Sequence, residues 1–383
     1  MPDTNAVRAF LEKRHVALAD AVAEYAGEHL APRREPADDD ACRIEARALT
    51  AEMGAAGWLE AIRDRDFRAC SLIREAVAAA SPLADAMFAL QALGTVPILL
   101  AGSEDQQAEW VPGVIGGTTI AAFAMTEPEA GSDVASLETT ARRDGESFVL
   151  NGAKTLISNA GIADFYTVFA STEPNEGREG ISCFIVPRET EGLRFVRPLI
   201  LSSPHPLGEI AFEDCRVPAS NLLGSEGTGY RLGLATLDKL RATVAAAACG
   251  MAERALEEAI AHACTRRQFG KRLADFQLIQ DKLARMATDL TAARLLTYRA
   301  AWEVDSGAPR VTMEAAMAKA FATEAAQRIV DDAVQIFGGR GVVADHPVDR
   351  LYRSVRALRI YEGTTEIQQL IIAGQLIKAA TPP

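Results

Sequence analysis

Three short turns in the sequence carry residues whose types and spacing could do chemistry. They are TEPEAGSD (126–133), FGGRG (337–341) and EGTTE (362–366). Each offers backbone N–H groups, and some offer hydroxyls, that could bind a phosphate or the polar edge of a ring. The usual nucleotide signatures, GxGxxG after a strand and GxxxxGK followed by Ser or Thr, do not occur. Either no dinucleotide binds, or it binds without these motifs.

Glu362 lies in the third turn, within RIYEGTTEIQQL (359–370), and is the strongest candidate for a reacting group. The apolar approach that ends at Tyr361 predicts a partly desolvated carboxylate, and the raised pKa would make it a better acceptor of a proton from carbon. The alternative is a helix cap, because an acid near the start of a helix stabilises the helix dipole. Glu366 already fills that position. The pattern therefore favours Glu362 as a general base.

The elements that must position these turns change in type along the chain. Residues 5–115 carry Ala, Leu, Glu and Arg at helical spacing, with breaks at 31–36 and at Ser81-Pro82. From about residue 231 the helical pattern returns, with breaks at TRRQFG, SGAP and FGGRGVVADHP. The sequence therefore predicts two helical regions, one at each end of the chain.

The region between them has the composition of strands. Short runs of strand-forming residues, among them DFYTVFAS and GISCFIVPR, alternate with Gly, Pro and acidic turns. Asn151-Gly152, a dipeptide typical of hairpins, is predicted to join two such runs. Because helices, strands and helices follow one another in blocks, we expect layers of different class and no doubly wound sheet.

Composition excludes several functions. The 383 residues carry a formal charge of −12, which argues against a broad surface for nucleic acid or anionic membrane. The six cysteines have no metal-binding spacing, so free thiols in a reducing cytosol and no metal site are expected. The N-terminus has no export signal and no uninterrupted apolar stretch reaches membrane length. A cytoplasmic protein without membrane insertion is predicted.

The polar turns, taken together with their order, resemble the acyl-CoA dehydrogenase family over nearly the whole chain. FAMTEPEAGSD is similar to the first signature of that family. QIFGGRG and IYEGTTE are similar to its C-terminal signature, in which the glutamate is catalytic, and TRRQFG matches a block between them.

The resemblance implies a mainly α fold with a central β domain. We expect an N-terminal helical domain (1–120), a middle β-barrel-like domain (121–226) and a C-terminal four-helix bundle (227–383). It also implies a homotetramer built from dimers, and FAD bound in extended form, which would explain the missing Rossmann motif.

One group of implied FAD contacts lies in the middle region. Phe123, Thr126 and Ser132 match positions that line the flavin ring and the pyrophosphate, and Ser158 matches a hydroxyl that hydrogen-bonds flavin N5. Leu156 stands where the family usually has Trp. For the first motif the alternative is a Pro-Gly loop that only links a helix to the barrel.

A second group of implied FAD contacts lies in the C-terminal region, some of them reaching the FAD of a partner subunit. These residues are Arg266, Phe269, Gln335, Gly339, Thr364 and Glu366. The guanidinium of Arg266 suits a pyrophosphate. The alternative is an ordinary solvated basic pair at a helix end, which is favoured for Arg267.

Substrate contacts are implied for Ser132, Asp238, Arg241 and Gly363. The i, i+3 spacing of Asp238 and Arg241 also permits a plain surface ion pair, which would contribute little to stability. Some family members carry the base immediately before this arginine, where this chain has Leu240.

The implied activity is FAD-dependent α,β-dehydrogenation of an acyl-CoA thioester, with the α proton going to Glu362 and the β hydride to flavin N5. The implied electron acceptor is an electron-transferring flavoprotein. Alternatives are an acyl-carrier-protein thioester dehydrogenase, an enoyl reductase of a specialised pathway, and a non-dehydrogenating flavoprotein of the same fold. Two departures from the family pattern suggest a specialised subgroup: LSSPHPLGEI (201–210), which contains His205, and RSVR, which has Ser354 where Asp is common.

Overall fold

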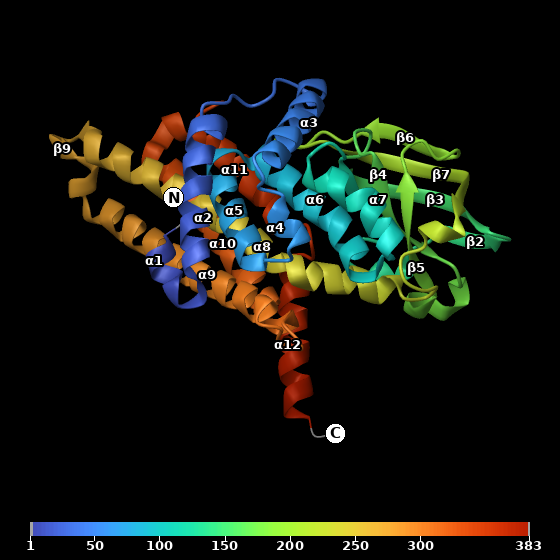
Figure 1. Ribbon diagram of the computed structural model, residues 1–383. Coiled ribbons are helices and arrows are strands. Elements are labelled where there is room, and N and C mark those ends of the chain that lie inside the picture. The colour runs from blue at the N-terminus through green and yellow to red at the C-terminus, as the bar shows by residue number, and fades with distance from the viewer. Residues whose placement is uncertain (1–2, 382–383) are drawn as a thin grey trace. The chain divides into compact units, whose positions relative to one another are not determined.

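The computed structural model describes residues 3–381, which form two compact units (Figure 1). The helical unit contains the chain up to Glu35, Asp66–Asp85, and the chain from Asp238 onward. The sheet unit contains Pro36–Arg65 and Ala86–Leu237. The predicted succession of helices, strands and helices is confirmed.

The helical unit is built from helices, most of them long, and one small hairpin. Its helices are α1 (Thr4–Val7), α2 (Lys13–Tyr25), α5 (Phe67–Ala80), α9 (Gln277–Asp305), α10 (Thr312–Phe337), α11 (Pro347–Leu358), α12 (Thr365–Ala380) and most of α8 (Gly229–Thr265). A two-stranded hairpin, β8 (Arg267–Gln268) and β9 (Lys271–Arg272), joins α8 to α9. The helices end at the predicted breaks, since α8 stops at Thr265, α9 at Asp305 and α10 at Phe337.

Helices α8 to α11 share one apolar core. The buried face of α8 is made mainly of alanine, with Ala245–Ala248 fully buried, so neighbouring backbones can approach closely. Gly250 marks the tightest approach, because a Cβ at this position would overlap the backbone carbonyl of Glu75 on α5. The helical bundle therefore depends on small residues at its centre.

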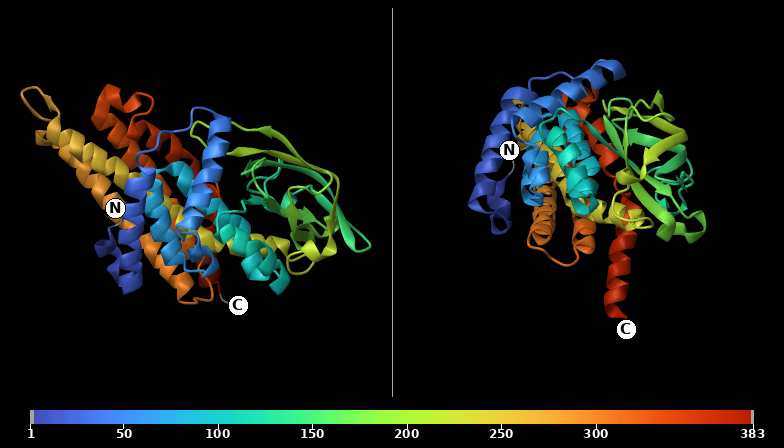
Figure 2. Two further views of the ribbon diagram at one scale, coloured as in Figure 1. Left: turned by 45° about the horizontal axis from the view of Figure 1, so that its top comes forward. Right: turned by 45° about the vertical axis from the view of Figure 1, so that its right-hand side comes forward.

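The sheet unit combines helices with a curled seven-stranded sheet (Figure 2). Its helices are α3 (Asp39–Ala55), α4 (Glu60–Arg63), α7 (Glu104–Ile115) and most of α6 (Pro82–Ala101). Its strands are β1 (Ala121–Ala124), β2 (Thr140–Asp144), β3 (Ser147–Ser158), β4 (Phe165–Ser171), β5 (Ile181–Pro187), β6 (Leu193–Pro198) and β7 (Leu207–Pro218). The order is β1-β4-β2-β3-β7-β6, and β5 also pairs with β4. Strand β4 is buried along its whole length, as its apolar sequence requires.

The prediction that Asn151-Gly152 forms a hairpin turn is wrong. Both residues lie inside the continuous strand β3, where the pairing with β7 shifts register between Leu150 and Gly152. A Cβ on Gly152 would lie 2.6 Å from Thr139 Oγ1, so the glycine permits a close approach at a bulge. The turn that joins β2 to β3 is at Gly145, which has a φ of +62°.

Among the described residues, helix α6 is long and apolar enough to cross a membrane. Most of this segment is buried inside the structure, which is the usual pattern of a core helix.

We predict that Gly250→Ala destabilises the protein. The added methyl group must push α8 away from α5, and overpacking of this kind typically costs about 1–3 kcal/mol. Gly374→Ala on α12 is the matched control, since its Cβ would meet nothing within 4 Å. That variant should be neutral or slightly stabilising, because Ala favours helix over Gly by up to about 1 kcal/mol. Urea unfolding of both variants would check this, and equal stabilities would contradict the close approach at Gly250.

Candidate active site

The turn between α11 and α12 has a strained backbone. Glu362 has a φ of +54° and Gly363 a φ of +89°, both in the left-handed region. For a residue with a side chain, such a conformation costs on the order of 1–3 kcal/mol and persists only where the surroundings hold it. Gly363 is restricted further, because a Cβ there would lie 2.5 Å from Nε2 of Gln368.

Side chains from three helices hold this turn by its carbonyl groups. Gln368 of α12 donates from Nε2 to the carbonyl oxygens of Glu362 and Gly363, at 3.1 and 3.0 Å. Lys319 of α10 donates from Nζ to the Gly363 oxygen at 2.7 Å. Arg241 of α8 donates from Nε to the Glu362 oxygen at 3.4 Å. These bonds fix the position from which the Glu362 side chain extends.

A buried ion pair contributes to the electrostatics of the same site. Arg74 of α5 donates to the two carboxylate oxygens of Asp85, at 2.7 and 2.9 Å, and to Thr243 Oγ1 at 2.9 Å. Both members of the pair are buried. A bidentate geometry of this kind satisfies the two charges without solvent.

Glu362 experiences opposing influences on its acidity. Burial raises the pKa of its carboxyl group, and the nearby charges of Arg74, Lys319 and Arg241 oppose this effect. Asp85 adds a smaller effect that raises the pKa. The net result is a pKa above the ordinary value for glutamate, so the carboxylate is a stronger base than an exposed one.

Two polar groups of Glu362 have no partner among residues 3–381. The carboxylate Oε2 is inaccessible to solvent and receives no hydrogen bond. The backbone N–H donates to no acceptor. Because buried polar atoms are almost always hydrogen-bonded, the unpartnered Oε2 indicates a place where another molecule supplies the missing contact.

Asp238 and Arg241, predicted to contact substrate, lie beside this turn. Arg241 is buried and forms an ion pair with Asp238, whose other oxygen accepts a hydrogen bond from Thr312 Oγ1 at 2.7 Å. The pair is therefore part of the site and not a plain surface ion pair. Leu240, between them in sequence, is a buried apolar residue.

Thr364 and Glu366, predicted to contact FAD, begin helix α12. The Thr364 hydroxyl caps the helix by accepting from Ile367 N–H at 3.3 Å. Glu366 is exposed in the first turn, where backbone and Thr364 hydrogen bonds lower the pKa of its carboxyl group. Thr364 and Glu366 therefore stabilise the start of α12, and Glu362 is not needed as a helix cap.

The other predicted FAD contacts of the helical unit are exposed near ends of helices. Arg266 follows α8, and Phe269 occupies the turn of the β8–β9 hairpin with 93% of its surface exposed. Gln335 lies in the last turn of α10, and Gly339 follows that helix. A Cβ on Gly338 or Gly339 would meet nothing within 4 Å, so the backbone there is open to a ligand.

Five FAD contacts were predicted in the sheet unit, and four of them lie close together at the ends of β1 and β3. Thr155 N–H donates to the Thr126 carbonyl at 3.0 Å, and Asn159 Nδ2 donates to the Ala121 carbonyl at 2.9 Å. These bonds place Phe123 and Thr126 on one segment next to Leu156 and Ser158 on the other. Leu156 is 56% exposed at a bulge and has a φ of +55°. Ser132 is exposed in the loop that follows β1.

His205 is hydrogen-bonded to one of these residues. Its Nε2 lies 2.7 Å from Ser158 Oγ. Burial, with a smaller contribution from Arg43, lowers the pKa of His205 to about 4, so the ring is neutral at pH 7. The unusual segment around His205 therefore adjoins the predicted flavin contact Ser158.

Four residues around the Glu362-Gly363 turn were not predicted from the sequence: Arg74, Asp85, Lys319 and Gln368. Lys319 gave the best signal, as a lone lysine on the apolar face of an alanine-rich helix. Asp85 resembled an ordinary acid in the first turn of a helix, and the pairing of Arg74 with it is visible only in three dimensions.

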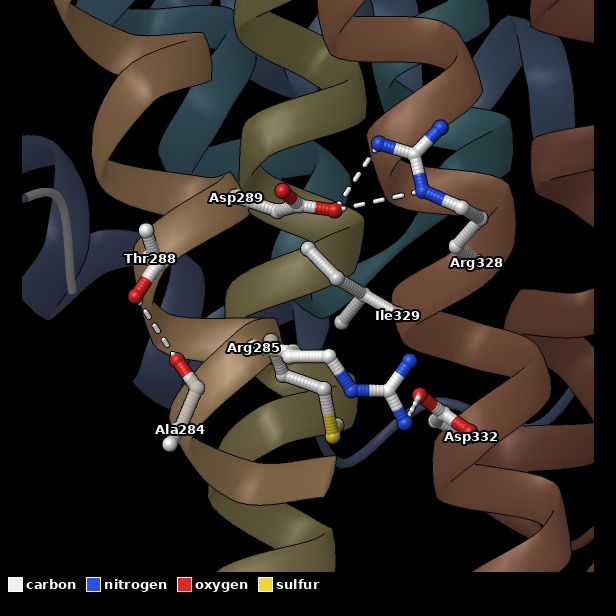
Figure 3. Close-up of a pocket in the computed structure, with 8 residues that line it drawn as sticks. Ala284, Arg285, Thr288, Asp289, Arg328, Ile329 and Asp332 are labelled. Atoms are coloured by element: carbon white, nitrogen blue, oxygen red, sulfur yellow. Dashed lines mark hydrogen bonds and ion pairs between the residues drawn. The ribbon is translucent and has the colours of Figure 1, made fainter. Parts of the chain in front are cut away.

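A hollow elsewhere in the helical unit contains none of the predicted site residues. It lies between α9 and α10, has a volume of about 390 Å³, and is lined by ion-paired side chains such as Asp289 and Arg328 (Figure 3). Within residues 3–381, no group of three or more His, Cys, Asp or Glu side chains could hold a metal ion.

Comparison with known protein families accounts for nearly the whole chain. Models described as the N-terminal, middle and C-terminal domains of acyl-CoA dehydrogenase match residues 12–118, 122–215 and 227–377.

Individual relatives match over most of their length. A probable acyl-CoA dehydrogenase of Mycobacterium tuberculosis, FadE25, is 37% identical, with 96% of each chain covered. A 3-(aryl)acrylate reductase of Clostridium sporogenes is 43% identical over 82% of this chain and 84% of its own. The solved structure of butyryl-CoA dehydrogenase from Megasphaera elsdenii superposes with a TM-score of 0.89 at 33% identity, covering 96% of this chain and 99% of the other.

We predict that Arg74→Met strongly destabilises the protein, because it leaves the Asp85 carboxylate buried without its partner. Removal of one member of a buried pair costs about 3–5 kcal/mol. The double variant Arg74→Met/Asp85→Leu removes both charges and should recover most of this loss. Urea unfolding would compare them. A single variant as stable as the parent would show that the pair is not buried as described.

Proposed function

Because the chain belongs to the acyl-CoA dehydrogenase family, we propose that it is an FAD-dependent oxidoreductase that dehydrogenates an acyl thioester, with Glu362 as the general base. The observation that carries this proposal is the Glu362 carboxylate itself. It is held on a strained backbone, and its buried Oε2 has no partner among residues 3–381. A proton acceptor for a carbon acid needs a carboxylate that is positioned and not already neutralised by hydrogen bonds.

The residues present fit FAD. The open backbone at Gly338 and Gly339 and the exposed ring of Phe269 leave room for a large planar group and its phosphates. The residues that would hold FAD are Phe123, Thr126, Ser132, Leu156, Ser158, Arg266, Phe269, Gln335, Gly339, Thr364 and Glu366. When bound, FAD supplies the acceptor for the hydride from the β carbon.

The protein's own groups would handle the proton and the carbonyl. Glu362 removes the α proton, and burial makes its carboxylate a stronger base than an exposed one. The positive charges of Arg74, Lys319 and Arg241 oppose this rise in the pKa and favour the ionised form of the carboxylate. The unpartnered N–H of Glu362 is available to donate to the thioester carbonyl as negative charge develops there. Asp238, Arg241, Ser132 and Gly363 complete the proposed substrate contacts.

The substrate, partners and assembly are inferred from the family. We propose an acyl-CoA thioester as substrate, an electron-transferring flavoprotein as electron acceptor, and a cytoplasmic location. Domain boundaries near residues 120 and 226 and a homotetramer are also proposed. Exposed apolar side chains on α12, among them Leu370 and Ile377, support association of subunits.

A second candidate activity is reduction of an α,β-unsaturated acyl group, since one relative is named an acrylate reductase. The same site would serve, with Glu362 returning a proton to the α carbon. A carrier-protein thioester in place of CoA is a further alternative substrate. Anaerobic mixing with saturated CoA thioesters, saturated carrier-protein thioesters and enoyl thioesters separates these cases. Bleaching of oxidised flavin by a saturated CoA thioester supports the dehydrogenase, whereas reoxidation of reduced flavin by enoyl thioesters alone supports the reductase.

We predict that Glu362→Gln abolishes most activity while leaving the fold and FAD content intact. Glutamine is nearly isosteric but cannot accept the proton, and a positioned general base contributes about 10²–10⁴ in rate. The measurement is the rate of anaerobic flavin reduction by the thioester that bleaches the parent. Asp238→Asn is the control, since it removes the charge of a neighbouring carboxylate. Its loss of flavin-reduction rate should be smaller, because Asp238 is already paired with Arg241. A Glu362→Gln rate within a few-fold of the parent would exclude Glu362 as the base.

A further inference from the structure

We propose that Lys319 is a positioning residue for the general base: its ammonium group anchors the Glu362-Gly363 turn and supplies a positive charge that faces the Glu362 carboxylate. The proposal rests on the proposed function, in which Glu362 accepts the α proton.

The surroundings of Lys319 are unusual for a lysine. Its side chain is fully buried on α10, although lysine is almost never buried without an opposite charge as partner. Among the described residues it forms no salt bridge, and its one hydrogen bond goes to the Gly363 carbonyl at 2.7 Å. The single hydrogen bond of this buried cation is therefore with the turn that carries Glu362.

The charges that face Lys319 come from several elements. Glu362 exerts the largest attraction and Arg241 of α8 repels it, while Glu324 of α10 and Glu366 of α12 attract it more weakly. Glu324 is already hydrogen-bonded to Arg359 Nε and to Thr365 Oγ1, each at 2.7 Å. Glu362 is thus the facing carboxylate that retains an unpartnered buried oxygen.

Lys319 is not required to satisfy the carbonyl that it contacts. Gln368 Nε2 also donates to the Gly363 oxygen, at 3.0 Å. Loss of the lysine amine would leave that oxygen bonded, so a purely structural need for hydrogen bonding does not explain the buried charge. Burial lowers the pKa of Lys319 to about 8, which shows that its charged form is held at a cost to folding. The contribution of Lys319 to the site is therefore the positive charge of its ammonium group.

Two measurements without substrate test the proposal on the purified, FAD-loaded protein. Infrared difference spectra, taken against Glu362→Gln, follow the titration of the Glu362 carboxyl group. In Lys319→Met this titration should move to higher pH by about one unit, because one of the cations that favour the carboxylate is gone. Arg74, Arg241 and Asp85 also face Glu362 and are unchanged in this variant.

The matched control is Arg328→Met, which removes a positive charge from the same helix at the hollow between α9 and α10 (Figure 3). Arg328 is paired with Asp289 at 2.8 Å, and its side chain is 55% exposed. The Glu362 titration should be unchanged in that variant, since solvent screens this charge.

Urea unfolding provides the second measurement. At pH 7 two effects of Lys319→Met on stability oppose each other, because methionine removes a buried charge but also removes one of the cations that favour the ionised Glu362. The free energy of unfolding of Lys319→Met, relative to that of the parent, should decrease as the pH rises above 8. The folded parent then releases the Lys319 proton while the unfolded chain retains it, and the parent gains stability with pH.

An unshifted Glu362 titration in folded Lys319→Met would overturn the proposal. If Lys319→Met does not fold, Lys319→Gln is measured in the same way, since it keeps a donor and removes only the charge. Failure of both variants to fold would assign Lys319 to the fold and also overturn the proposal. A parent that is reduced by no thioester, but whose Glu362 titration still responds to Lys319→Met, would refute the dehydrogenase and not the charge coupling.

Discussion

The site depends on hydrogen-bond donors from three helices that meet at two successive carbonyl groups. Arg241 of α8, Lys319 of α10 and Gln368 of α12 all bind the backbone at Glu362 and Gly363. A left-handed glutamate is unfavourable alone, so this backbone exists only where the helices are correctly packed. The apolar core shared by α8 to α11 therefore determines where one carboxylate points.

Two of the residues that hold the backbone, Arg241 and Lys319, also contribute with Arg74 to the positive charge around the Glu362 side chain. Burial alone would leave Glu362 protonated over a wide pH range, and cations alone would make it a weak base. The site combines both influences, with a net increase in the pKa of Glu362. An intermediate basicity of this kind suits a group that must take a proton from carbon at neutral pH and later release it.

Local sequence was sufficient to predict those parts of the molecule that depend on neighbouring residues. The helix ends at Thr265 and Asp305 lie at the predicted breaks TRRQFG and SGAP. The proposal of Glu362 as general base also began from local features, the apolar approach and the spare acid at Glu366. The prediction of a turn at Asn151-Gly152 was wrong because this dipeptide is equally compatible with a bulge. A bulge forms here because the backbone of Gly152 packs closely against Thr139. Lys319 and Gln368 could not be assigned, since their roles depend on contacts between helices that are distant in sequence.

The central claim is that an ionised, unpartnered Glu362 takes the α proton, and the pH dependence of flavin reduction tests it most directly. With a reducing thioester well below saturation under anaerobic conditions, the rate reports the ionisations of the free protein and should fall as the pH drops through a single ionisation. Its midpoint should lie above 4.5, the ordinary pKa of glutamate, because burial raises the pKa of Glu362. This acid limb should be absent from the residual rate of Glu362→Gln. A rate in the parent that stays constant down to pH 4.5, or an acid limb that persists in Glu362→Gln, would contradict the account.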